Sequence, residues 1–136
     1  MPLNASTKLL FVINPFSGNS NINWYNEITN YFKLLPYSIA YFTVKKGCTT
    51  QIIQQQITNF LPQVVVAVGG DGTIKLVAEC IIQTNITLGI LPAGSANGLA
   101  KELGISNQPI QALNALVNGK LQQIHVTEIN KHLCIH

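Results

Sequence analysis

The sequence predicts an α/β fold, with a doubly wound, mostly parallel sheet covered by helices on both faces. Short, uninterrupted apolar runs alternate with longer segments in which apolar residues recur every three or four positions. Uninterrupted apolar runs are typical of parallel strands that are buried on both faces, and the second spacing is typical of amphipathic helices. Gly, Pro and Asn separate the segments, as expected for the turns between them.

The first half of the chain contains three predicted strands and two predicted helices. Each strand is an apolar run that ends at a turn, and each helix carries one apolar face. A proline follows both helices and ends them, because proline cannot continue a helix. Thr49-Thr50 offers a cap for the second helix. In order, the elements are strand Lys8–Ile13, helix 21–35, strand Ser38–Val44, helix Thr49–Phe60 and strand Val64–Val68.

The second half repeats the alternation. A helix over Thr73–Gln83 precedes the fourth strand, Thr87–Leu91. A short helix then ends at Leu103, where the next residue is a glycine, a typical helix stop. A further helix covers residues 110–117, and residues 121–135 return to strand-like alternation.

The composition excludes several classes of protein. The length of 136 residues suits one domain, and a chain of this size buries roughly two thirds of the surface that it exposes when unfolded. The apolar fraction is 47% and the charged fraction 10%, which is unlike a disordered chain. The net charge is only +3 and the eight lysines are scattered, whereas nucleic-acid-binding surfaces need clustered basic residues. We therefore expect no nucleic-acid partner.

Sequence features also predict the cellular compartment of the protein. No apolar run approaches the roughly 20 residues that span a bilayer, and the N-terminus lacks the pattern of a signal peptide. The three cysteines are far apart, which favours reduced thiols in a cytoplasmic protein. The histidines and the cysteine between residues 125 and 136 fit a strand and a chain end better than a metal site, because no ligand spacing is repeated.

Four unusual loops follow the predicted strands. They cover Asn14–Asn19, Thr43–Gly47, Gly69–Thr73 and Pro92–Gly98. The carboxyl ends of parallel strands meet at one edge of the sheet, and ligands of such sheets bind beyond that edge. We therefore expect the four loops to form one site.

The loop Gly69-Gly70-Asp71-Gly72-Thr73 contains the only aspartate of a chain that has no arginine. Glycine allows a positive φ and the close approach of another group. A strand that leads through such a turn into a helix is a common way to hold a phosphate, because backbone N–H groups and the helix dipole point at it. The pattern predicts a phosphate site with Asp71 beside it.

Three blocks of this sequence resemble the signature blocks of the diacylglycerol kinase catalytic domain. They are Asn14-Pro15-Phe16-Ser17-Gly18, the block Gly69–Thr73 and the block Leu91–Ala100. That family includes lipid kinases that act on diacylglycerol and on sphingoid bases. The second block also resembles turns of NAD kinases and phosphofructokinases. The third block is more similar to lipid kinases than to NAD kinases, and closer to the sphingosine-kinase branch.

The resemblance implies a division of the chain. Residues 1–122 correspond to an α/β nucleotide-binding lobe of the kind found in NAD kinases and diacylglycerol kinases. Residues 123–136 resemble the start of a crossing into a second, largely β lobe that this chain lacks. Because that lobe contributes further catalytic groups in the family, we expect the 136-residue chain to bind nucleotide weakly and to transfer phosphate poorly.

The function implied by the resemblance is phosphoryl transfer from ATP, with Mg²⁺, to a lipid hydroxyl. Asp71 is the implied catalytic residue: it holds Mg²⁺ through water, or it orients or deprotonates the attacking hydroxyl. The lipid substrate makes peripheral contact with a membrane an expectation. The implied nucleotide-contacting residues are Asn14, Pro15, Ser17, Gly18, Thr43, Gly69, Gly70, Asp71, Gly72, Thr73, Gly94, Ser95 and Asn97.

Structural alternatives stand beside these roles. Asp71 could be a turn residue that bonds its own backbone, and Asn14 could belong to a simple Asn-Pro turn. Ser95 and Asn97 could cap the following helix, and Thr43 could be an ordinary strand residue. The aromatic residues at helical spacing within residues 21–35 are explained better by core packing than by a membrane-facing surface.

The chain also departs from the family pattern at five positions. Lys75 and Leu76 stand where a polar pair, commonly ending in Glu, is frequent. Asn19, Gly98 and His125 replace a basic residue and two aspartates that are frequent in the family. A lysine in the first turns opposes the helix dipole, and we hypothesise that Lys75 leans toward bound phosphate.

These departures leave alternatives to a lipid kinase lobe open. One is a nucleotide-binding module or truncated lobe without catalysis, and a less favoured one is a relative of the NAD kinases.

Overall fold

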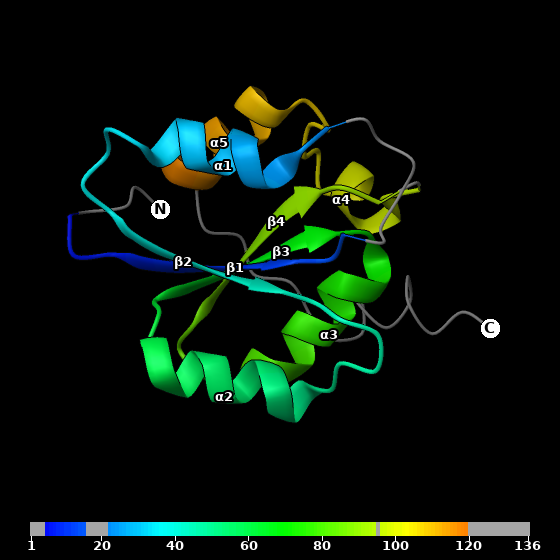
Figure 1. The fold of residues 1–136 in the computed structure, drawn as a ribbon. Coiled ribbons are helices and arrows are strands. Elements are labelled where there is room, and N and C mark those ends of the chain that lie inside the picture. Colours follow the sequence, from blue (N-terminus) through cyan, green and yellow to red (C-terminus); the bar gives the residue numbers. More distant parts are fainter. Residues whose placement is uncertain (1–4, 16–21, 95, 120–136) are drawn as a thin grey trace.

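The computed structural model describes residues 5–15, 22–94 and 96–119, and it confirms the predicted α/β fold. Four parallel strands form one sheet in the order β2-β1-β3-β4. Helices α1 and α5 cover one face of the sheet, and α2 and α3 cover the other (Figure 1). The elements are β1 Lys8–Ile13, α1 Trp24–Phe32, β2 Ser38–Thr43, α2 Thr50–Phe60, β3 Val64–Gly69, α3 Asp71–Ile81, β4 Thr87–Pro92, α4 Gly98–Glu102 and α5 Pro109–Asn118.

The strands were predicted to within one residue, but two helices differ from the prediction. Helix α1 begins only after Asn23, whose side chain accepts a hydrogen bond from the Asn26 N–H at 3.1 Å, and it ends at Phe32. Helix α3 begins at Asp71, two residues earlier than predicted, with Gly70 as its N-cap. Asp71 is therefore part of the first helical turn. The strand-like segment 121–135, and with it the predicted crossing 123–136, lies outside the described residues.

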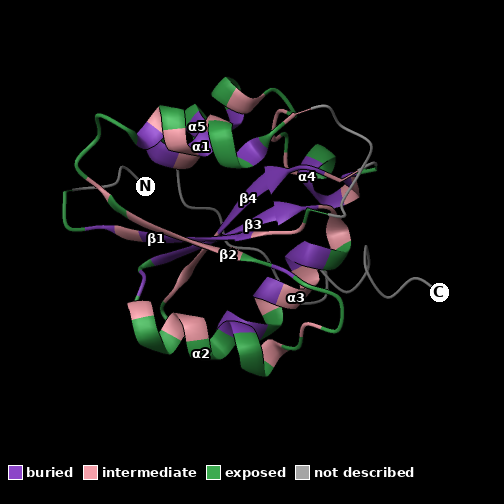
Figure 2. Cartoon of the chain, in the orientation of Figure 1, coloured by how far each residue is buried: buried purple, intermediate pink, exposed green. Residues whose placement is uncertain are grey.

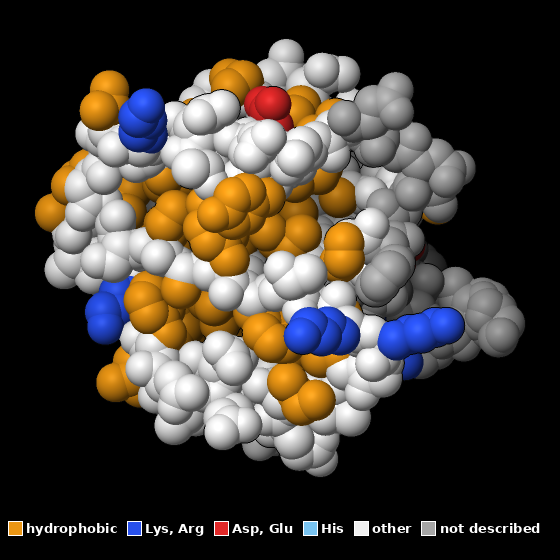
Figure 3. Space-filling view, viewed as in Figure 1, with side chains coloured by type: hydrophobic (Ala, Val, Ile, Leu, Met, Phe, Trp, Pro, Cys, Tyr) orange, Lys and Arg blue, Asp and Glu red, His pale blue; other side chains and the backbone are white. Residues whose placement is uncertain are grey.

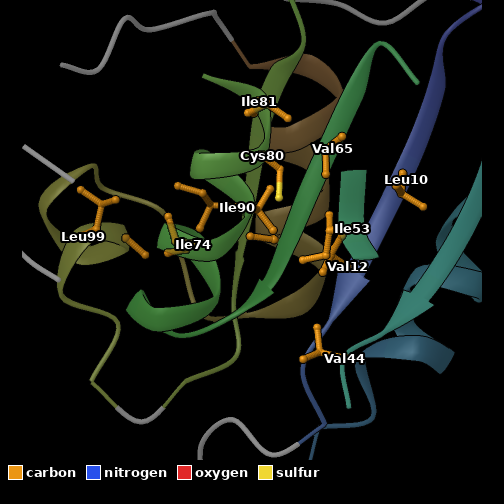
Figure 4. Close-up of a cluster of buried hydrophobic side chains, with 13 residues drawn as sticks. Leu10, Val12, Val44, Ile53, Val65, Ile74, Cys80, Ile81, Ile90 and Leu99 are labelled. Atoms are coloured by element: carbon orange, nitrogen blue, oxygen red, sulfur yellow. The ribbon is translucent and has the colours of Figure 1, made fainter. Parts of the chain in front are cut away.

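The two faces of the sheet explain the uninterrupted apolar strands. Alternate residues of a strand point to opposite faces, so both faces of β1 and β3 need apolar side chains. Leu10 and Val65 pack in one buried cluster with α2 and α3, whereas Leu9 and Val66 pack in a second cluster with α1 and α5. Every residue of β3 is buried (Figure 2). Figure 4 shows the first cluster, in which side chains of β1 and β3 meet those of the two helices.

Aromatic residues of α1 serve mainly the second cluster, as expected. Trp24 and Phe32 are buried, whereas the ring of Tyr25 is half exposed and lies 4.5 Å, centroid to centroid, from Tyr41 of the edge strand β2. Apolar side chains are also visible across the middle of the face seen in Figure 3, with a few lysines scattered among and around them. Among the helices described, none combines the length and apolarity needed to cross a membrane.

The strand order places a topological switch between β1 and β3. From β1 the chain passes through α1 to β2 on one side, and β3 lies on the other side of β1. The N–H of Asn14, directly after β1, donates to the Val68 carbonyl of β3 at 3.0 Å, so the carboxyl ends of these strands are adjacent. In open parallel sheets this is the place where ligands bind.

Two neighbouring isoleucines of α2 allow a matched test of the core. Ile53 is fully buried, whereas Ile52 is 43% exposed. We expect Ile53→Ala to lower the free energy of unfolding by about 2–5 kcal/mol, because it leaves a cavity in the cluster of β1, β3 and α3. Ile52→Ala changes the helix propensity by the same amount, and we expect it to change the free energy of unfolding by no more than about 0.5 kcal/mol. Urea unfolding followed by the fluorescence of Trp24, the single tryptophan, measures both, and equal losses would contradict the placement.

Candidate functional site

A shallow pocket of about 170 Å³ lies beyond the carboxyl ends of the strands, at the switch between β1 and β3. Its lining comes from the loops after β1, β2 and β3 and from the first turns of α3. The lining residues are Asn14, Val44, Gly70, Gly72, Thr73 and Leu76. Three of the four loops expected to converge therefore do so at one pocket.

The start of α3 forms one wall of this pocket. The first intrahelical bond runs from the Ile74 N–H to the Gly70 carbonyl at 3.1 Å, so the preceding N–H groups of the first turn have no partner within the helix. These groups and the positive end of the helix dipole favour an anion. Gly72 is exposed, and a Cβ built on it meets no atom within 4 Å, so space is left beside these N–H groups.

No glycine of this loop has a positive φ, and Gly70 serves close packing instead. Among the described glycines, a positive φ occurs only at Gly47 and Gly104. A Cβ built on Gly94 would lie 2.4 Å from the Gly70 Cα and 2.9 Å from the Gly70 nitrogen. The loop after β4 therefore packs backbone to backbone on the loop after β3. A side chain at Gly94 would separate the two loops.

The Asp71 carboxylate joins the same two loops by hydrogen bonds. Its Oδ2 accepts from the Gly98 N–H and its Oδ1 from the Leu99 N–H, both at 3.2 Å. Asp71 therefore caps α4, which begins 27 residues later, and does not bond its own turn. The two N–H groups would otherwise lack partners at the start of this helix, and they partly offset the negative charge.

The side chain of Asn97 does not cap α4, although Asn97 occupies the N-cap position. Its Oδ1 accepts from the Gly94 N–H and its Nδ2 donates to the Gly94 carbonyl, both at 2.8 Å. The residue is buried and has a left-handed backbone, with φ 51° and ψ 45°. The helix-cap alternative for Asn97 is thus wrong, because Asp71 supplies the cap. The Asn97 amide closes the loop that precedes α4.

Asn14 and Thr73 form a polar pair in the pocket wall. Asn14 Nδ2 donates to Thr73 Oγ1 at 3.2 Å, and Thr73 is buried. The bond ties the end of β1 to the first turn of α3. Because the hydroxyl oxygen accepts from Asn14, its hydrogen can be donated to another group. Asn14 is therefore part of the site and more than a local turn residue.

The wall next to β2 is made by Val44 and not by Thr43. Thr43 is exposed at the end of β2, whereas Val44 is buried and its N–H donates to the Ile13 carbonyl at 2.8 Å. Leu76 was recognised in the sequence only as a departure from the family. It lies three residues after Thr73, and this spacing puts both on one side of α3.

The remaining predicted residues take other positions. Gly69 ends β3 and pairs with Pro92 of β4. Pro15 is exposed and does not line the pocket. Ser17, Gly18 and Ser95, together with the departures at Asn19 and His125, lie outside the described residues.

In the part of the chain that the structure describes, the titratable groups provide neither a cluster of metal ligands nor an ionised thiol. Among residues 5–15, 22–94 and 96–119, no group of three or more His, Cys, Asp or Glu side chains could hold a metal ion. Burial raises the pKa of Cys80 to about 11, with smaller contributions from Glu79 and Cys48, and burial also raises the pKa of Cys48. Both thiols therefore stay protonated at neutral pH, which argues against a nucleophilic thiolate in this part of the chain.

Together these features define the class of the protein. It is an α/β protein whose doubly wound parallel sheet carries, at its switch point, a helix start that favours an anion, with one carboxylate in the same helical turn. The chain belongs to the diacylglycerol kinase catalytic domain family, whose model matches residues 8–129.

Curated relatives carry lipid kinase names. The chain is 34% identical over 96 residues to "Lipid kinase YegS" of Escherichia coli (strain K12), covering 68% of this chain and 32% of that protein. It is 42% identical over 74 residues to "Probable lipid kinase YegS" of Escherichia fergusonii, covering 52% and 25%. The chain thus spans about a quarter to a third of the length of these relatives.

Solved structures agree on the fold. A crystal structure described as a diacylglycerol kinase from Bacillus anthracis str. Sterne is similar with a TM-score of 0.62 at 20% identity, covering 85% of this chain and 41% of that one.

Two glycines of the site offer a matched stability test. We expect Gly94→Ala to destabilise the fold by about 1–3 kcal/mol, because the new Cβ would overlap the Gly70 backbone and Asn97 Oδ1. Gly72→Ala meets open space inside a helix, so its free energy of unfolding should stay equal or rise by up to about 1 kcal/mol. Urea unfolding of the two variants measures the difference. A smaller loss at Gly94 than at Gly72 would refute the packing of the two loops.

Proposed function

We propose that this chain is the nucleotide-binding lobe of a lipid kinase that transfers the γ-phosphoryl group of ATP to a lipid hydroxyl. One observation carries the proposal: the pocket at the β1–β3 switch has the start of α3 as its wall. Membership of the diacylglycerol kinase catalytic domain family supports it, and so do the names of the curated relatives. The proposal includes peripheral contact with a membrane and a cytoplasmic location.

The phosphates would lie against the N–H groups of the first turn of α3. Gly72 leaves room there, and Thr73 can donate its hydroxyl hydrogen. Phosphoryl transfer depends mainly on positioning and on stabilising charge, and fixed backbone dipoles supply both. The pocket of about 170 Å³ is smaller than typical ligand pockets of about 300–1,000 Å³, so it would take only part of the nucleotide. The rest of the nucleotide would be held by the other contacts proposed from the sequence, which include Ser17, Gly18, Thr43 and Ser95.

The residues present fit Mg²⁺ as an ion that arrives with the nucleotide. Mg²⁺ is usually held by one or two carboxylates together with substrate phosphates and waters. Asp71 is the single acid of the described loops at this edge, and two N–H groups already occupy part of its carboxylate. We therefore propose that Asp71 holds the ion through water. When bound, Mg²⁺ neutralises charge that develops on the transferred phosphoryl group.

Asp71 is also the proposed catalytic group. Asp71 shares the first turn of α3 with Gly72 and Thr73 of the pocket wall, although it does not itself line the pocket. From this position its carboxylate would orient the attacking hydroxyl or accept its proton. This role belongs to the whole protein, of which the chain covers the nucleotide side. A second candidate is a nucleotide-binding module without catalysis. Leu76 favours it, because an apolar side chain lines the pocket where the family commonly has Glu.

Binding of Mg·ATP to the ¹⁵N-labelled chain tests the proposed function. We expect amide signals of Gly70, Asp71, Gly72 and Thr73 to shift on titration, because these N–H groups would meet the phosphates. Amides around Gln83, which follows α3 at the other edge of the sheet, should stay unchanged. An NAD titration run in parallel tests the alternative that the chain is a relative of the NAD kinases. Unmoved signals at Gly70–Thr73 under saturating Mg·ATP would defeat the proposal.

Lys75 provides a test of charge at the start of α3. If its ammonium group leans toward bound phosphate, Lys75→Ala should weaken ATP binding about fivefold, which corresponds to about 1 kcal/mol. Lys33, exposed at the far end of α1, is the matched control, and Lys33→Ala should leave the affinity unchanged. Calorimetric titration gives both dissociation constants. Equal affinities of Lys75→Ala and the unaltered chain would rule out the contact.

A further inference from the structure

We infer that Asn97 is a positioning residue that binds no ligand itself and acts through Asp71, by fixing the start of α4 so that the carboxylate is held beside the first turn of α3. The inference rests on the proposed function, because it assigns Asn97 a part in Mg²⁺-dependent nucleotide binding. It differs from the ligand contact that the sequence implied for this residue.

The side chain of Asn97 is already engaged. Its amide oxygen and its amide nitrogen both bond Gly94, at 2.8 Å each, and the residue is only 8% exposed. An amide is needed for this pair of bonds, since one end must accept and the other must donate. An aspartate could keep only the bond from the Gly94 N–H. A ligand would have to displace these buried bonds to reach the amide.

The backbone of Asn97 aims the next two residues at Asp71. Its left-handed conformation turns the chain into α4, whose first bond runs from the Lys101 N–H to the Asn97 carbonyl at 2.9 Å. Asn tolerates this conformation better than most residues. The N–H groups that follow directly, those of Gly98 and Leu99, are the two that the Asp71 carboxylate accepts. The Leu99 side chain is anchored in the same buried cluster as Ile74 of α3 (Figure 4).

A second connection leads from Asn97 to the same helix. The bonds to Gly94 hold the backbone that packs on Gly70, where a Cβ on Gly94 would be 2.4 Å from the Gly70 Cα. Gly70 is the N-cap of α3. Asn97 thus reaches the first turn of α3 both by packing through Gly94 and by hydrogen bonds through Asp71.

This arrangement predicts which part of the ATP affinity changes when Asn97 is replaced. Phosphate bound without a cation is held by the N–H groups of α3 and is repelled by the carboxylate. Phosphate bound with Mg²⁺ gains from a carboxylate in the correct orientation. Loss of the Asn97 amide should therefore reduce the gain in ATP affinity that Mg²⁺ provides, while the affinity in EDTA stays nearly constant.

The first experiment needs no nucleotide. We expect Asn97→Gly, which keeps the positive φ accessible, to shift the amide signals of Gly98 and Leu99 in the same direction as Asp71→Asn does. Gln83→Gly is the matched control, because Gln83 also has a positive φ, of 65°, on an exposed turn. It should leave both signals in place. Signals that are unchanged in Asn97→Gly would overturn the inference, whatever the nucleotide binding.

The second experiment is calorimetric titration of ATP with Mg²⁺ and with EDTA. Asn97→Gly should cut the Mg²⁺-dependent gain about tenfold and change the affinity in EDTA by less than about twofold. In an Asp71→Asn background it should have no further effect, because both changes act on the same carboxylate. Equal losses in both solutions, or additive losses in the double variant, would contradict positioning. If the unaltered chain binds no ATP, the proposed function fails, and the amide shifts still decide the role of Asn97.

Thermal unfolding followed by Trp24 fluorescence checks that each variant is folded. If Asn97→Gly is unfolded at the working temperature, Asn97→Asp replaces it, because its Oδ1 can still accept from the Gly94 N–H. The same amide shifts and the same loss of the Mg²⁺-dependent gain are expected. An Asn97→Asp variant that leaves both unaltered would refute the inference.

Discussion

The pairing of the Asp71 carboxylate with the N–H groups of Gly98 and Leu99 is the interaction on which the site depends. This pairing supplies hydrogen-bond partners to two sets of groups. A partly buried carboxylate needs donors, and the first N–H groups of α4 need an acceptor that α4 cannot supply. The bonds also bring two loops, 27 residues apart in sequence, into a fixed relation. The backbones of Gly70 and Gly94, which belong to the same two loops, pack directly on each other.

The topology of the sheet explains why these loops can meet. Because β3 adds next to β1 and β2 lies on the other side, helices leave the sheet in opposite directions at the β1–β3 switch. The space between them is bounded by backbone and by the first turn of α3. The apolar side chains of β1 and β3 fill both faces below it. Packing on both faces therefore fixes the strand ends, and the strand ends fix the pocket.

The sequence predicted what depends on local patterns. The strands were found almost to the residue, since β1 and β3 are apolar on both faces and end at turns. The prediction for α1 ran too far, because the apolar spacing continues to Leu35, whereas the helix ends at Phe32 and Leu35 is 37% exposed. Partners distant in sequence could not be predicted. For the glycines of the Gly69–Thr73 loop the sequence allowed either a positive φ or a close approach, and it did not indicate that Gly94 would be the group that approaches Gly70. Asn97 was expected to bind ligand or to cap α4, but Asp71 took the capping role.

The charges around the pocket bear on how it would hold the proposed nucleotide. A triphosphate is strongly negative, whereas the described pocket offers neutral N–H dipoles, the Asn14–Thr73 pair and the apolar side chains of Val44 and Leu76. The one carboxylate nearby would repel phosphate if it stood alone. Its two N–H partners reduce that repulsion and leave acceptor capacity toward a hydrated cation. Under the function proposed above, such a pocket would favour a nucleotide that brings its own Mg²⁺, and its selectivity for the metal-bound form would arise from the orientation of Asp71 and not from a cluster of acidic ligands.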